Sequence, residues 1–158
     1  MQFSPQSRVW VYQSNRAFSA TEAAEIQAKL DQFIAGWLAH GNALKAKAEI
    51  RYNYFIILTV DEGVHSATGC SIDASVRVLK EIEQQYQLDL FNRFNIAYRI
   101  GDQILVTGKE DFETLVNIKK VTPETIVFNN MVLTQDELEN KWEVPFAGSW
   151  HAHIFKIA

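Results

Sequence analysis

Alternation of apolar and polar residues marks the middle of the chain as β-structure. Over residues 46–54 apolar side chains occupy the even positions, which predicts a strand with one face in the core and the other in water. Residues 55–60 are almost entirely apolar, which predicts a strand buried on both faces. The join at Tyr52 and Asn53 permits either a tight turn between two strands or a bulge in one long strand.

Helices are predicted where apolar residues recur every three or four positions. The predicted helices cover residues 20–40, 72–86, 110–117 and 135–141. Ser19 and Glu22 have the spacing of a capping box at the start of the first helix. Ser71 is the expected cap of the second. Gly41 follows the first stripe and is expected to end that helix.

The remaining β-rich runs complete the predicted fold. Further strands are expected at 8–13, 95–100, 103–107 and 125–128. The two residues Gly101 and Asp102 separate two of these strands, as in a tight hairpin. The order of elements is typical of an α+β or α/β protein with two layers, in which helices pack on a mixed sheet of about five or six strands.

The domain organisation is expected to be simple. No repeat, low-complexity tract or Pro/Gly/Ser-rich linker interrupts the chain, so residues 1–158 are expected to form a single globular domain. Residues 1–7 are polar and are expected to form a loose N-terminus. Residues 142–158 are rich in aromatic side chains, so this tail is expected to pack on the body of the domain.

Composition excludes several classes of protein. Of the 158 residues, 47% are apolar, which is enough for a substantial core. The formal net charge of −4 argues against a protein that binds nucleic acid mainly through phosphates. Cys70 is the only cysteine, so an internal disulfide and a zinc site of several cysteines are excluded. With no long apolar run and no secretion signal in the sequence, we expect a cytoplasmic protein without a membrane partner.

Five segments of the chain together resemble a family of short bacterial proteins that often carry the label "ABC transporter ATPase". These segments are 9–16, 39–42, 69–73, 126–130 and 141–146. The resemblance covers nearly the whole chain but implies no particular activity and no catalytic residues. The motifs do not support the label. Lys109 follows a glycine but precedes Glu110, the earlier glycine of a phosphate-binding loop is missing, and the Leu-Ser-Gly-Gly-Gln signature is absent. We therefore do not expect an ABC-type ATPase.

Polar residues directly follow three predicted apolar strands, at 13–16, 61–62 and 129–130. If these strands run parallel, the polar residues gather at the sheet edge where open α/β sheets bind ligands. The helix that begins near Ser71 would add free amides for an anion. We therefore expect a small anionic molecule to bind there without catalysis; the alternative is that these are ordinary turn and capping residues. The candidate ligand-binding residues are Asn15, Arg16, Arg51, Ser71, Asn129 and Asn130.

Two other functions remain open. Cys70 lies at a predicted helix start, which favours the nucleophilic thiolate, and His65 is close in sequence, so a thiol-dependent enzyme with Cys70 as its catalytic residue is one hypothesis. The aromatic tail favours a protein-interaction or homo-oligomeric module instead. His151 and His153 lack nearby cysteines or a spaced carboxylate, so no metal site is predicted, and no cofactor is expected either.

Overall fold

The computed structural model describes residues 2–155 and has the α+β class that the sequence predicts. The strands are β1 (Arg8–Gln13), β2 (Leu38–Ala39), β3 (Asn42–Ala43), β4 (Ala46–Arg51), β5 (Phe55–Val60), β6 (Ile96–Ile100), β7 (Gln103–Thr107), β8 (Ile126–Phe128) and β9 (Glu143–Pro145). The helices are α1 (Ala20–Ala35), α2 (Gly69–Tyr86), α3 (Lys109–Asn117), α4 (Gln135–Lys141) and α5 (His151–Ile154), with a 3-10 turn at Phe146–Gly148.

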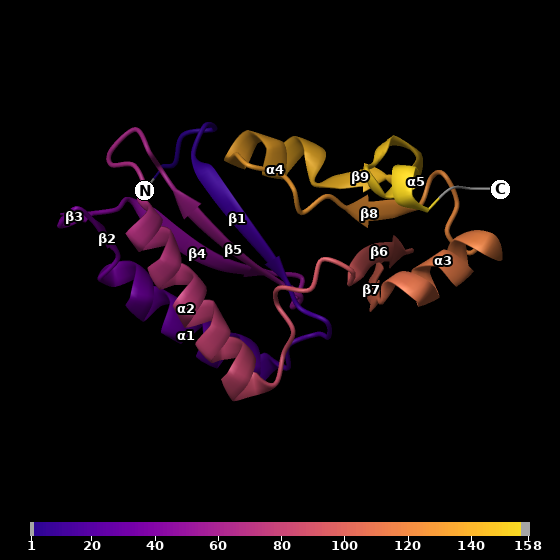
Figure 1. Cartoon of the computed structure of the whole chain (residues 1–158), viewed down its shortest axis with the longest axis horizontal. Helices are drawn as coiled ribbons and strands as arrows, with labels where there is room; N and C mark the ends of the chain where they lie inside the picture. The colour runs from indigo at the N-terminus through magenta and orange to yellow at the C-terminus, as the bar shows by residue number, and fades with distance from the viewer. Residues whose placement is uncertain (1, 156–158) are drawn as a thin grey trace.

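The strands are divided between separate antiparallel sheets (Figure 1). One sheet has the order β1-β5-β4 and another has the order β7-β6-β8-β9, while β2 and β3 form a small hairpin. The expected arrangement was a single mixed sheet of five or six strands. The sheets are antiparallel because tight hairpins such as β4-β5 and β6-β7 can join only antiparallel neighbours.

Backbone angles decide the open question at Tyr52 and Asn53. Both residues have positive φ, at 56° and 58°, and with Tyr54 they form the short turn between β4 and β5. The alternative of one long bulged strand is therefore excluded. The second predicted hairpin is also formed, with Gly101 at φ 61° in the turn between β6 and β7.

Helix caps largely follow the sequence signals. The capping box of Ser19 and Glu22 is present at the start of α1. This helix ends at Ala35, several residues earlier than the spacing predicts, because the chain turns at Gly36 and forms the β2-β3 hairpin. The cap of α2 is Thr68 rather than Ser71, and Ser71 occupies the third helical position and completes a capping box with Thr68.

The period-two pattern of β5 distributes its side chains between two parts of the core. The even residues Ile56, Leu58 and Val60 pack with α1 and α2, which contact each other on one face of the first sheet (Figure 1). The odd residues Phe55 and Ile57 face the other way, toward side chains that follow β8 and end α4. The first sheet is therefore buried on both faces.

A chain of side-chain hydrogen bonds joins the two large sheets. Gln13, at the end of β1, donates from Nε2 to the carbonyl of Asn95, just before β6, at 2.9 Å. Asn130, just after β8, donates from Nδ2 to Oε1 of Gln13 at 2.8 Å. Trp142 then donates from Nε1 to Oδ1 of Asn130 at 2.9 Å. Gln13 and Trp142 are buried, so these bonds lie largely out of water.

Both ends of the described chain are attached to the body. The N-H of Gln135 donates to Ser7, and the N-H of Asp136 donates to Pro5, each at 2.9 Å, so the segment expected to be loose is anchored at residues 5–7. Met1 lies outside the described residues. In the tail, Trp142 and Phe146 are buried, as is Phe155, and residues 156–158 lie outside the described part. Among residues 2–155, no helix has the combined length and apolar character that a membrane crossing requires.

Replacement of Gln13 by leucine is expected to destabilise the fold. Gln13→Leu keeps a similar volume but leaves the Asn130 amide and the Asn95 carbonyl without their partner, at a cost of about 1–3 kcal/mol in the free energy of unfolding. Urea denaturation measures this loss. The matched control is Gln84→Leu on the exposed side of α2, expected to change stability by less than about 0.5 kcal/mol. Equal stability of the two variants would show that the bridge contributes nothing.

Candidate functional site

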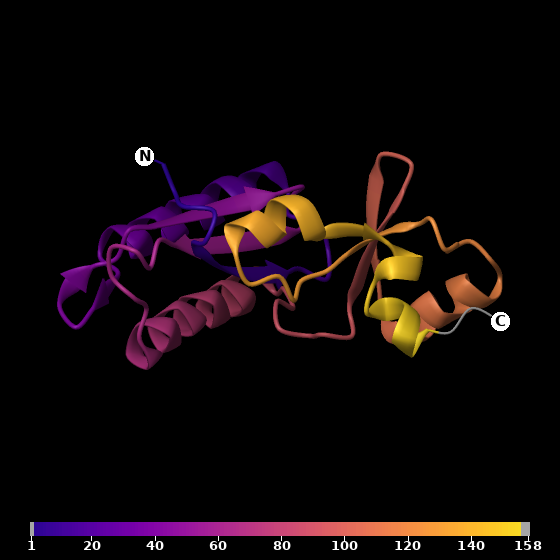
Figure 2. The same ribbon diagram turned by 90° about the horizontal axis from the view of Figure 1, so that it is seen from above.

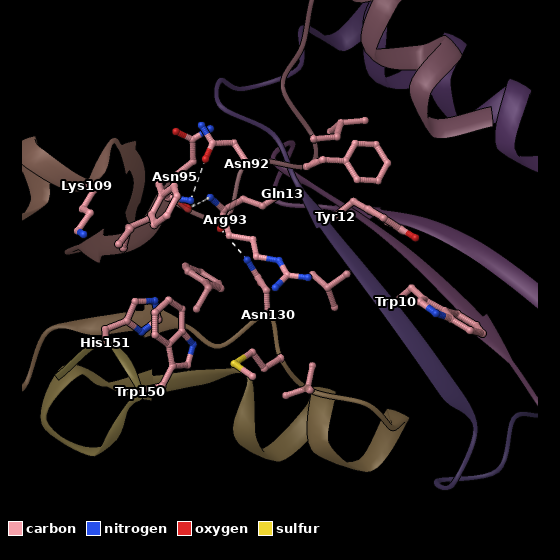
Figure 3. A pocket seen from close by; sticks show the side chains of 18 of the residues that line it. Trp10, Tyr12, Gln13, Asn92, Arg93, Asn95, Lys109, Asn130, Trp150 and His151 are labelled. Carbon is pink, nitrogen blue, oxygen red and sulfur yellow. Dashed lines mark hydrogen bonds between the residues drawn. The ribbon is translucent and has the colours of Figure 1, made fainter. Parts of the chain in front are cut away.

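A cleft of about 640 Å³ lies between β1 and the second half of the chain (Figure 3). Its lining comes from five places: β1, the loop between α2 and β6 with the start of β6, the first residue of α3, the end of β8 with the segment that follows it, and α5 with its flanking residues. The hydrogen bonds of Gln13 and Asn130 run through its centre (Figure 3). A volume of this size is within the range of ligand pockets in proteins.

Apolar side chains that water can reach make up much of the cleft wall. Five large ones that line it are between 38% and 69% exposed: Phe91, Phe94, Met131, Leu133 and Ile154. Exposed apolar side chains that occur singly are common, but a contiguous group usually marks a binding surface. These five come from three separate segments, so the fold itself brings them together.

The charged residues that line the cleft are both basic. They are Arg93, in the loop before β6, and Lys109, in the first turn of α3. No aspartate or glutamate is found among the lining residues, although acidic residues outnumber basic ones in the chain. Within residues 2–155, neither cation has a carboxylate within salt-bridge distance; Lys109 Nζ lies 5.5 Å from the centre of the Phe94 ring. The cleft is therefore electrostatically suited to an anion.

Two lining side chains carry buried polar atoms without a partner among the described residues. These atoms are Nδ1 of His151 and Nε1 of Trp150, whose rings stack with centroids 3.8 Å apart. His151 is only 2% exposed, and burial lowers its pKa to about 4, so the imidazole is neutral at pH 7. A buried donor or acceptor without a partner is uncommon in proteins and is often found at functional sites.

The structure brings some of the predicted site residues to this cleft and leaves others at its edge. Asn130 lines it and bonds to Gln13. The side chain of Asn129 instead bonds to the backbone of Lys141 and Met131. Asn15 and Arg16 continue from β1 beyond the cleft. Asn15 pairs with the backbone of Asp89, and Arg16 forms a salt bridge with Glu22 at 2.8 Å.

The remaining predicted residues lie elsewhere. Arg51 forms salt bridges with Glu49 and Glu139. Cys70 and Ser71 are in the first turn of α2, while Arg16 bonds to the carbonyl of Tyr86 at the other end of this helix, about 24 Å away at 1.5 Å per residue. The structure therefore does not bring Cys70 or Ser71 to the other candidates, because β1 and β5 are antiparallel and their polar ends lie at opposite edges of the sheet.

Reasoning from the sequence missed the basic and aromatic residues of the cleft. Arg93 and its neighbours Phe91 and Phe94 fall in a segment without helical or strand periodicity, and Lys109 was considered only as part of a phosphate loop. The sequence does contain one signal for them. Phe91 and Phe94 flank Arg93 in a segment between predicted elements, where large apolar side chains are less common than polar ones.

The buried imidazole of His151 predicts a specific pH dependence of stability. Because its pKa is lowered from 6.5 to about 4, the unfolded chain takes up a proton between these values that the folded chain does not, and stability falls as pH falls. The contribution lost is about 3 kcal/mol by pH 4. Urea denaturation between pH 7 and pH 4 is expected to show a smaller loss for His151→Asn. His153→Asn, an exposed neighbour, is the control and should keep the wild-type loss; equal losses in all three proteins would contradict this assignment.

The cleft is therefore the candidate functional site of this chain. No protein family model, curated protein or solved structure matches the chain.

Proposed function

We propose that this chain is a non-catalytic binding protein and that the cleft takes a ligand with an apolar body and an anionic group. This proposal keeps the anionic ligand expected from the sequence but places it at Arg93 and Lys109 rather than at Arg16, Arg51 and Ser71. The observation that carries it is the charge of the lining, which has two cations and no acid in a chain with a formal net charge of −4.

The chemistry of the described lining residues favours binding over catalysis. They include no serine, threonine, cysteine, aspartate or glutamate, the side chains that most often act as nucleophile or as carboxylate acid and base. Nδ1 of His151 has no hydrogen-bond partner among the described residues, so the imidazole lacks the neighbouring acid that usually orients a catalytic histidine. The apolar walls supply burial for a ligand body, and the cations at the rim supply attraction for its charge.

The alternatives derived from the sequence stay predictions. The thiol of Cys70 is exposed in the first turn of α2, and Cys70 is not among the residues that line this cleft. Formation of a homo-oligomer through the aromatic tail stays an expectation from the sequence. The cytoplasmic location stays one as well.

The proposal is tested with pairs of small molecules that share an apolar body, one anionic and the other neutral. We expect hexanoate, phenylacetate and phenyl phosphate to raise the melting temperature, because a ligand that binds only the folded state stabilises it. Hexanamide, phenylacetamide and phenol are expected to have a smaller effect. Equal shifts from the anionic and neutral members, or none from either, would count against an anion site.

Removal of the two cations provides the matching test on the protein. The double variant Arg93→Gln with Lys109→Gln is expected to bind the anionic probes roughly two- to thirtyfold more weakly, since an exposed ion pair contributes about 0.2–1 kcal/mol. The control is Arg77→Gln with Lys120→Gln, which removes the same charge from exposed positions outside the cleft. If both double variants weaken binding equally, the effect is one of net charge and the proposed location is wrong.

A further inference from the structure

The outer edge of β1 forms one wall of the cleft. β1 is the edge strand of its sheet, with β5 as its neighbour on one side, and all residues from Val9 to Gln13 line the cleft. In an antiparallel pair, alternate residues turn their N-H and C=O groups toward the partner strand. Ser14 N-H bonds to Tyr54 at 2.7 Å, which continues the ladder with the β5 side, so the even residues of β1 point toward β5 and the odd residues point outward.

The two ends of this outward edge are paired, and its middle is not. At one end Val9 N-H donates to Leu133 at 3.0 Å, and at the other Asn15 N-H donates to Asp89 at 3.2 Å. Between them, within residues 2–155, no hydrogen bond to another segment is found for the outward N-H and C=O of Val11 or for the N-H of Gln13. An unpaired stretch of strand about five residues long, or roughly 16 Å, therefore faces the cleft.

An unpaired strand edge is suited to binding an extended peptide. An extended peptide can pair with it through backbone hydrogen bonds, and its alternate side chains then enter pockets on either side. Exposed apolar side chains from three segments line the same cleft as β1 and can contact such a peptide. They include Leu133, Phe91 and Ile154. A compact small molecule would use the apolar walls but would leave the backbone groups of Val11 unpaired.

The charge of the cleft lining favours an acidic peptide over a basic one. Arg93 and Lys109 line the same cleft without any acidic neighbour in the lining, so a peptide with acidic side chains or a free C-terminal carboxylate is favoured over a basic one. In Figure 3, Arg93 lies beside Gln13 and Asn130, close to β1, and Lys109 lies on the opposite side of the cleft. Arg93 therefore lies beside the strand edge, and Lys109 lies across the cleft from it.

We infer that the ligand of the cleft is an extended acidic peptide segment, which adds to β1 as a fourth strand of the β1-β5-β4 sheet. This inference rests on the proposed function and specifies its ligand. The backbone of the peptide pairs with Val11 and Gln13, its apolar side chains contact the cleft walls, and its acidic groups lie near Arg93 and Lys109.

The test uses a pool of N-acetylated hexapeptides in which Val, Ile, Leu or Phe alternates with Asp or Glu. Amide hydrogen exchange of the whole chain is followed by NMR with and without the pool. We expect exchange of the Val11 amide to slow at least tenfold at saturation, because a strand partner protects it. The same pool methylated on its amide nitrogens keeps charge and side chains but cannot donate to a strand edge, and is expected to bind at least tenfold more weakly.

Variants of β1 provide a second readout. Val11→Pro removes the outward N-H, and proline is tolerated on edge strands, so this variant is expected to lose binding of the pool. Val11→Ala removes more of the side chain than Val11→Pro but keeps the N-H, and should bind nearly as well as wild type. If Val11→Pro does not fold, the methylated pool and the exchange of Val11 still decide the question.

The outcomes separate this inference from the proposed function. Equal binding of the two pools, or an unprotected Val11 amide, overturns strand addition even when hexanoate and phenylacetate still bind through Arg93 and Lys109. A pool that fails to bind while those small anions do bind overturns it as well. If neither peptides nor small anions bind, both proposals fall.

Discussion

The side chain of Gln13 connects the two halves of this fold. It accepts a hydrogen bond from Asn130 after β8 and donates one to the carbonyl of Asn95 before β6, while its own backbone belongs to β1. A buried amide whose donor and acceptor are both used has a fixed orientation, because any other arrangement leaves a polar group without a partner. Together with the apolar contacts between the sheets, such as that of Phe55 with Phe128, these two bonds hold the second sheet beside β1 and the cleft.

Division of the strands between two sheets is what creates a binding surface. A single continuous sheet would pair β1 on both sides and bury its edge. Here β8 pairs with β6 and β9 instead, so β1 keeps an open side. The two sheets meet through apolar contacts such as that between Phe55 and Phe128 and through the amides of Gln13 and Asn130. The loop before β6 covers part of this open edge, which limits access to small or extended ligands.

Several local signals in the sequence predicted the structure correctly, although the expected cap of α2 and the expected end of α1 were wrong. The capping box of Ser19 and Glu22 and the turn at Gly101 were predicted from spacing alone, since each is set by backbone geometry over three or four positions. The candidate site was predicted less well. Of its six ligand-binding residues, Asn130 is the one that lines the cleft. Cys70 and Ser71 were grouped with it on the condition of parallel strands, which antiparallel hairpins do not meet.

The sequence by itself determined the α+β class, the helices α1 to α4, the β6-β7 hairpin and the burial of both faces of β5, because periodicity and turn chemistry act locally. Only the tertiary structure decided that the strands separate into two sheets and that Arg93, Lys109 and His151 line the same cleft. Pairing between distant strands depends on side-chain contacts that no local pattern encodes, such as the bond between Gln13 and Asn130 across 117 positions of the chain.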